Sequence, residues 1–178
     1  LMVQRNITAV HNPVSNLKLA SGAARVPRLL ERGVNVALGT DGVASNNSHD
    51  LFEEIKLAAL LHKGIGLDPA AVTARQALEM ATINGARALR RNTGVIAPGK
   101  TADLILVDLA APNLFACHDV EADLVYSARG SNVVMNMARG RVIYEKGEFF
   151  TLDLEKIRAE VEGYALPRIF GSVRGGGA

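Results

Sequence analysis

A glycine-flanked aspartate is the residue best placed by type and spacing for chemistry. It lies in Gly39-Thr40-Asp41-Gly42, directly after the apolar run from Val34 to Leu38. A carboxylate just past the end of a buried parallel strand lies where barrel and open-sheet enzymes build their sites, and flanking glycines allow close approach of a ligand. A turn in which Asp41 caps a neighbouring amide explains the same pattern equally well. The residues alone leave both interpretations open.

A histidine and two small polar residues are the other candidates. His11 follows the apolar run from Asn6 to Val10, and the loop after Asp41 contains Ser45 and Asn46. A lone histidine at a strand end is more often a packed, hydrogen-bonded residue than a ligand. Its place next to Asp41 on adjacent strand ends nevertheless favours a shared pocket.

The motifs that would complete a catalytic metal site are missing from these 178 residues. A catalytic zinc usually takes three protein ligands and a water, and the sequence contains no His-x-His, His-Glu-x-x-His or Cys-x-x-Cys. A phosphate-binding loop and a nucleophile elbow are also absent. The remaining histidines have no partner at a suitable spacing, so we expect one on a helix face and two in loops: His62, and His49 with His118.

Composition excludes several classes of partner. Hydrophobic residues make up 48% of the chain and charged residues 21%, as in soluble globular proteins. The 20 basic and 18 acidic residues are scattered, so we expect neither nucleic acid nor a membrane as a partner. No apolar run is long enough for a membrane span, and no secretory signal opens the chain. Cys117 is the only cysteine. We interpret it as a partly buried residue in a reducing, cytoplasmic setting.

The elements that must position Asp41 and His11 are predicted to run strand, helix, strand. Strands are expected at 6–10 and 34–38, with a polar loop and then a helix at 23–32 between them. This order, with its short connection, predicts parallel α/β architecture. Further helices are expected at 50–63, 73–80 and 84–90. The first begins after Asp50 and has its water-exposed side at Glu53, Glu54 and Lys56.

The character of the sequence changes near residue 93. Strands are predicted at 102–108, 124–127, 133–138 and 141–145, forming an antiparallel sheet, and a last helix from 153 to about 164. We therefore predict four parts, the last of them a glycine-rich, disordered tail. Their bounds are 1–93 (α/β), 94–150 (mostly β), 151–171 (helical) and 172–178 (tail).

Three stretches, in order and spacing, resemble deaminases of the amidohydrolase superfamily. Residues 11–22 (HNPVSNLKLASG) resemble the loop after their seventh barrel strand, and residues 36–47 (VALGTDGVASNN) look like their eighth strand and its loop. Residues 94–104 (GVIAPGKTADL) are similar to their linker into a small β-sandwich. The resemblance covers roughly residues 1–165. It is strongest to the 5-methylthioadenosine/S-adenosylhomocysteine deaminases, and triazine chlorohydrolases and guanine-type deaminases share much of the pattern.

The resemblance implies a (β/α)8 barrel, with residues 1–93 contributing its seventh and eighth strands. Part of a β-sandwich and a C-terminal helix would follow. The family's metal, usually zinc, is held by a His-x-His on strand one, a histidine on strand five and the strand-eight aspartate, of which only Asp41 has a counterpart here. The acid/base glutamate and the strand-six histidine would also lie upstream. We therefore expect a C-terminal piece whose partner is the missing N-terminal part of the same protein.

The resemblance also implies hydrolytic deamination of S-adenosylhomocysteine or 5-methylthioadenosine to the inosine analogue and ammonia. The metal would lower the pKa of a bound water, and Asp41 would ligate the metal and accept the water's proton. The hydroxide would attack C6 of the purine while the upstream glutamate protonates the ring. His11 would shape the pocket at its rim, and Ser45 and Asn46 would meet the ribose or order the loop.

Two alternatives stay open at this point. One is another hydrolase of the same scaffold, acting on a triazine or an oxidised guanine. The other is a binding or structural module without chemistry. The sequence does not decide between a monomer and a homo-oligomer.

Overall fold

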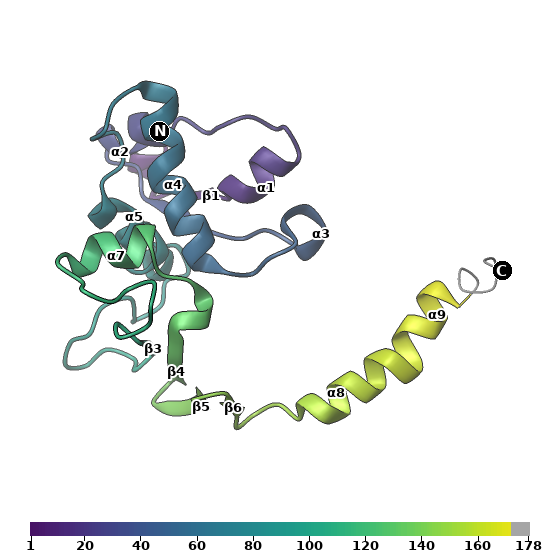
Figure 1. Ribbon diagram of the computed structural model, residues 1–178. Helices are drawn as coiled ribbons and strands as arrows, with labels where there is room; N and C mark the ends of the chain where they lie inside the picture. The colour runs from purple at the N-terminus through teal and green to yellow at the C-terminus, as the bar shows by residue number, and fades with distance from the viewer. Residues whose placement is uncertain (172–178) are drawn as a thin grey trace.

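Two short parallel strands organise the first half of the chain in the computed structural model, which describes residues 1–171 (Figure 1). After a 3-10 turn (Val3–Arg5), β1 (Ala9–His11) pairs in parallel with β2 (Val36–Leu38), and His11 lies opposite Leu38. Parallel strands present their carboxyl ends at the same edge of a sheet. The residues that follow β1 and β2 therefore emerge side by side, as the predicted strand-helix-strand order requires.

The connection between these strands contains two helices, α1 (Pro13–Lys18) and α2 (Val26–Glu31). The prediction of a loop directly after His11 was wrong. Pro13 occupies the first turn of α1, where its fixed φ favours a helix and its missing N–H costs nothing. The helix expected at 23–32 begins three residues later, at Val26. It stops as expected, because Gly33 adopts the left-handed conformation with φ +70°.

Helices from the middle of the chain cover the parallel sheet and bury the core. Asp50 accepts a hydrogen bond from the Phe52 amide and caps α4, and Thr73 caps α5 in a capping box with Gln76. The three predicted helices are thus confirmed with small shifts in their bounds, as α4 (Leu51–Gly66), α5 (Ala74–Ala81) and α6 (Ile83–Ala88), whereas the short helix α3 (Val43–Asn46) forms where a loop was expected. The core side chains are Val26, Val36, Ile55, Ala58, Ala59, Val72, Ala77, Met80 and Val125.

An antiparallel sheet of order β3-β4-β5-β6 follows, as predicted. Residues 124–126, however, belong to a helix that ends before Ser127, so the strand expected at 124–127 was wrong. Asp119 caps this helix by accepting from the Ala122 amide, and Val125 packs into the core beside α4 and α5. A short apolar run does not distinguish a buried helix from a strand. The elements are β3 (Leu104–Val107), α7 (Val120–Tyr126), a 3-10 turn (Gly130–Asn132), β4 (Val133–Ala138), β5 (Arg141–Glu145) and β6 (Glu148–Phe149).

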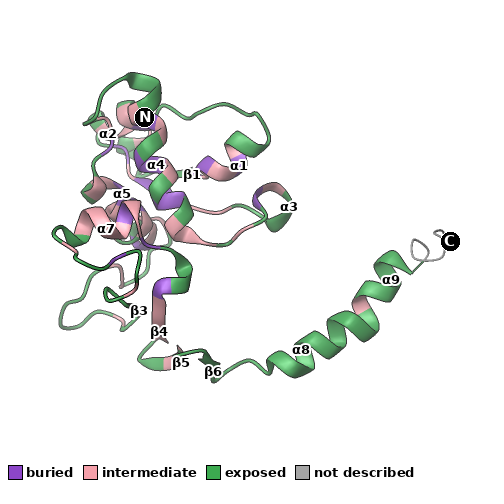
Figure 2. Ribbon diagram, viewed as in Figure 1, coloured by how far each residue is buried: buried purple, intermediate pink, exposed green. Residues whose placement is uncertain are grey.

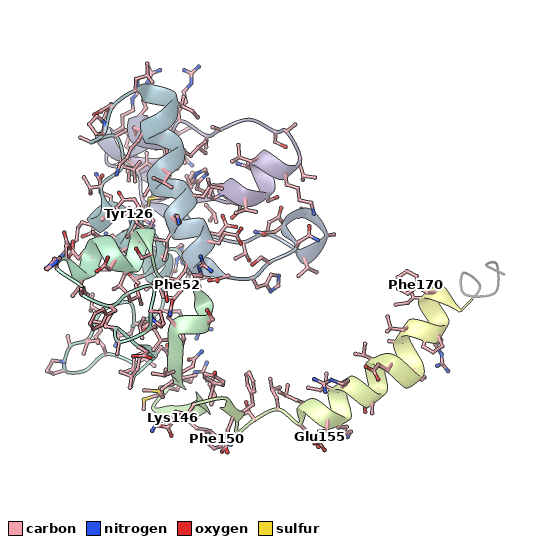
Figure 3. The ribbon with its side chains drawn as sticks, viewed as in Figure 1. Phe52, Tyr126, Lys146, Phe150, Glu155 and Phe170 are labelled. Atoms are coloured by element: carbon pink, nitrogen blue, oxygen red, sulfur yellow. The ribbon has the colours of Figure 1, made fainter. Side chains whose placement is uncertain are left out.

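The last described helix projects away from the rest of the chain (Figures 1 and 2). It comprises α8 (Leu154–Glu160), a π-helical turn (Val161–Ala165) and α9 (Leu166–Phe170), so it continues beyond the predicted end near 164. Apolar side chains along it are exposed. Phe170 projects from α9 far from Phe52 and Tyr126, which lie beside the core (Figure 3). The predicted disordered tail, 172–178, lies outside the described residues.

The surface of the chain is large for its size. It exposes 12109 Å², whereas a compact monomer of this mass exposes about 8,300 Å². Much apolar surface is therefore left uncovered. The division of the chain near residue 93 stays a prediction, and α7 from the second half packs on α4 and α5 of the first.

Within residues 1–171, no helix combines the length and apolar character needed to cross a membrane.

Candidate functional site

Asp41 lies exposed just beyond the carboxyl end of β2, with φ +60° in the left-handed region. Its Oδ2 accepts a hydrogen bond from the Ser15 hydroxyl (2.7 Å), and its Oδ1 accepts one from the Gly42 amide (2.7 Å). The pKa of Asp41 is lowered mainly by the hydrogen bond from Ser15, and further by the Gly42 amide and the nearby Ser45 hydroxyl. The carboxylate is therefore ionised at neutral pH, and it is held in a fixed direction by donors from two different loops.

Ser15 is a site residue that the sequence interpretation missed. It lies in α1, directly after β1, and is 2% exposed. Its hydroxyl reaches across to Asp41 because the parallel pairing of β1 and β2 places their following loops next to each other. A second link between these loops runs from the Lys18 ammonium to the carbonyl of Ala44 (3.0 Å). The signal for Ser15 was its position shortly after the strand that is expected to adjoin the Asp41 strand.

His11 is buried, with 3% of its surface exposed, rather than at the rim where we expected it. Its Nε2 lies 3.3 Å from Nε2 of His62 on α4. The expectation that His62 has no partner was therefore wrong, although it does lie on a helix face. Burial, and secondarily the neighbouring His62, lower the pKa of His11 to about 4. Burial also lowers the pKa of His62, so both rings are neutral at pH 7 and one donates to the other.

Two further observations concern the surroundings of the histidines. Nδ1 of His11 is buried and has no hydrogen-bond partner among the described residues. His49 and His118 are exposed and lie outside helices and strands, as expected.

Asn46 orders the loop after Asp41. The side chain is 5% exposed, and its Nδ2 donates to the Thr40 carbonyl (2.6 Å) and to Oε1 of Glu54 (2.5 Å). Its Oδ1 accepts from the Ser48 amide (3.2 Å). Because these partners occupy the amide, the geometry favours the loop-ordering alternative over a contact with ribose. Ser45 is half-buried and donates to the Gly42 carbonyl (3.1 Å), and it is the more accessible of the two.

The burial of Glu54 is the clearest departure from the sequence interpretation. We placed it on the water-exposed side of its helix, yet it is 0% exposed. Its Oε2 accepts from the Val14 amide (3.2 Å), and its Oε1 accepts from Asn46. Burial raises the pKa of Glu54, opposed by these two hydrogen bonds. The missed signal was spacing, because residues four apart share one helix face and Glu54 precedes the buried Ala58 and His62 at such intervals.

Residues 1–143 match the Amidohydrolase family. The chain belongs to the amidohydrolase family. A 5'-deoxyadenosine deaminase of Methanosarcina acetivorans is 52% identical over 160 residues, which are 90% of this chain and 37% of the relative. A 5-methylthioadenosine/S-adenosylhomocysteine deaminase of Moorella thermoacetica is 52% identical over 163 residues, with 90% and 38% covered. The resemblance seen in the sequence is thus confirmed.

A solved relative shows the same fold with a metal. The zinc-bound adenosine deaminase of Xanthomonas campestris superposes with a TM-score of 0.88 at 38% identity, over 92% of this chain and 38% of that one. The α/β architecture expected for part of an amidohydrolase is therefore confirmed. The chain spans about two fifths of the length of the curated relatives it matches.

The described residues could provide one of the several ligands that an amidohydrolase metal site needs. Among residues 1–171, no three His, Cys, Asp or Glu side chains lie close enough together to bind a metal ion. Asp41 combines an exposed, ionised carboxylate with a position just beyond the end of a parallel strand, and Ser15 orients it as outer hydrogen-bonding groups orient metal ligands. The described residues therefore supply one candidate metal ligand, Asp41.

Proposed function

We propose that this chain is the C-terminal part of a metal-dependent deaminase of adenosine-type nucleosides. Its substrates would be S-adenosylhomocysteine, 5-methylthioadenosine and 5'-deoxyadenosine, converted to inosine analogues with release of ammonia. The exposed, ionised Asp41 at the end of β2, fixed by Ser15, carries this proposal. Identity of 52% to two relatives named as such deaminases supports the substrate class over triazines and guanine.

In this proposal Asp41 binds the metal, which is zinc, and the remaining ligands come from outside residues 1–171. When bound, the metal lowers the pKa of a water molecule. Asp41 accepts the proton of that water at a carboxylate oxygen. Its low pKa keeps it ionised and therefore available to the metal across the neutral range. Ser15 keeps Oδ2 in place throughout, because its hydroxyl donates to that oxygen.

The other predicted site residues take supporting roles. His11 and His62 form a neutral, buried wall behind the strand ends, which shapes the pocket without carrying charge. Ser45 is the residue of its loop that we assign to the ribose, because Asn46 is occupied within the loop. The acid that protonates the purine ring belongs to the sequence outside this chain.

The uncovered apolar surface supports an N-terminal part of the same protein as the main partner. Val10 in β1 is 58% exposed and Ile7 just before it is 46% exposed, and the missing strands of a closed barrel would cover them. The total exposed area of 12109 Å², larger than that of a compact monomer of this mass, also supports a partner that covers this surface. We further propose a cytoplasmic location, because a single cysteine suits a reducing compartment.

A substrate panel tests the proposed function. The full-length, zinc-loaded enzyme is assayed for ammonia release with the three adenosine-type nucleosides. Two controls are guanine, assayed for ammonia release, and a chlorotriazine, assayed for chloride release. We expect turnover of the adenosine-type nucleosides and none of the controls. Turnover of a control alone, or no turnover of any nucleoside by fully loaded enzyme, would refute the assignment.

A further inference from the structure

A buried glutamate connects the two segments that follow β1 and β2 at the candidate site. These segments, here called the two loops, contain the short helices α1 and α3. Glu54 lies on α4, and its two carboxylate oxygens accept from different loops: Oε2 from the Val14 amide after β1, and Oε1 from Asn46 after β2. These loops are 40 and 8 residues away from Glu54 in sequence. The glutamate therefore joins segments that the parallel sheet only brings near each other.

Each of these hydrogen bonds leads on to Asp41. Val14 is followed by Ser15, whose hydroxyl donates to Asp41 Oδ2. Asn46 also donates to the carbonyl of Thr40, the residue before Asp41. Glu54 is thus connected to the carboxylate of Asp41 by one route and to its backbone by the other.

Keeping a carboxylate in this position is costly to the fold. Glu54 is fully buried, and among the described residues it forms no ion pair. Burying a carboxylate without a cationic partner destabilises a protein unless its oxygens are hydrogen-bonded. Stability alone would be served better by an apolar side chain at position 54, one turn of α4 before the buried Ala58. The position therefore calls for a role that only an acceptor with two oxygens can fill.

We propose that Glu54 is a positioning residue for Asp41, fixing both loops so that the aspartate carboxylate is preorganised for the metal. This inference rests on the proposed function. Glutamate suits the role because two N–H donors converge on its two oxygens. A glutamine has the same shape, yet it offers only one acceptor and turns its own N–H group toward a donor.

The test compares zinc affinity in the full-length protein by competition with a chelator. Outer hydrogen-bonding partners of metal ligands typically contribute 10–100-fold in affinity or activity. We therefore expect Glu54→Gln to weaken zinc binding by about 10–100-fold. The matched control is Glu53→Gln, which removes the same charge from the exposed neighbour on α4 and should match the wild type. Equal zinc affinity for both variants would overturn the inference.

Kinetics and coupling separate positioning from mere stabilisation. With zinc saturating, Glu54→Gln should lower kcat and leave KM near the wild-type value, because Glu54 acts on Asp41 rather than on substrate. Its effect on zinc affinity should also be non-additive with that of Ser15→Ala, which cuts one of the two routes. Additive effects together with unchanged kcat would assign Glu54 to fold stability alone.

Two further variants keep the outcome interpretable. If Glu54→Gln fails to fold, Glu54→Asp retains the charge and both acceptors but withdraws them by one methylene group. Weaker zinc binding by a folded Glu54→Asp protein supports the inference, and wild-type binding overturns it. Asp41→Ala separates the two proposals. If Asp41→Ala retains zinc and turnover, the proposed site itself is wrong, whereas loss of both with a silent Glu54→Gln refutes only the role of Glu54.

Discussion

Protonation of His11 should make the folded protein sensitive to acid. The pKa of His11 falls from 6.5 to about 4, mainly because the ring is buried and secondarily because His62 lies beside it. The folded state therefore binds this proton less readily than the unfolded chain does. The free energy of unfolding should decline as the pH drops below 6.5, and the loss should be complete near pH 4.

The size of the effect follows from the two pKa values. One pKa unit corresponds to about 1.4 kcal/mol, so full protonation across this window costs about 3 kcal/mol of stability. That is a substantial part of the 5–15 kcal/mol typical of folded proteins. The loss should be reversible on returning to neutral pH, since no bond is broken.

Urea unfolding of the metal-free, full-length protein between pH 7.5 and 4 measures this loss. His11→Asn removes the titrating group, so its stability should depend on pH less steeply than the wild type, by about 3 kcal/mol over the window. His49→Asn is the matched control, because His49 is exposed in a loop and should leave the wild-type profile unchanged. Identical profiles for His11→Asn and the wild type would refute the assignment of a neutral, buried His11.

Further predictions concern the completeness of the chain and its packing. Residues 1–178 alone should bind no zinc tightly after dialysis, because Asp41 is their one credible ligand; one firmly bound zinc per chain, by elemental analysis, would contradict this. The same 178 residues should not unfold cooperatively as a monomer, since their two parallel strands leave edges uncovered, and a sharp monomeric denaturation transition would count against the proposal. Gly94→Ala should destabilise the full-length protein by about 1–3 kcal/mol, because its Cβ would lie 2.8 Å from the Ile83 Cα. Gly99→Ala, with a similar positive φ and open space around it, is the control in denaturant unfolding, and equal losses would show backbone strain alone.

Local patterns predicted much of the fold. Asp50 caps α4 as expected, by accepting a hydrogen bond from an amide two residues away. Thr73, expected as the first residue of the next helix, forms its cap instead. The turn glycine Gly33 likewise specifies its own conformation. Such features depend on neighbours in sequence, so they are visible without a structure.

What the sequence did not show depends on contacts between distant segments. The helix at 120–126 forms where Val125 can enter a core built by α4 and α5. Its one local signal was the cap residue Asp119, which the strand prediction overlooked. The partnership of His11 with His62 joins residues 51 apart. Glu54 looked solvent-exposed because charged residues usually are, and only the donors from two remote loops make its burial possible.

The candidate site likewise contains one residue that a local pattern predicted and others that depend on contacts between distant segments. Asp41 stood out because a glycine-flanked carboxylate after an apolar strand is a local pattern with a known chemical use. Ser15 and Glu54, which hold it, became visible only when the loops after β1 and β2 were placed side by side. Of the two roles that the sequence left open for Asn46, the contacts of its amide favour ordering of the loop over a ribose contact.

The most direct test of the account is Asp41→Asn in the full-length enzyme, with ammonia release from S-adenosylhomocysteine and bound metal measured on the same samples. Asparagine keeps the size of the side chain and one oxygen for the metal, but it removes the negative charge and the base. Metal content should fall only in part. Turnover should drop by about 10²–10⁴-fold or more, the effect typical of losing a general acid or base. His11→Asn, in parallel, should retain metal and mainly alter KM. Near-normal turnover by Asp41→Asn with a full complement of metal would contradict the account and leave Asp41 as a residue that merely caps the Gly42 amide.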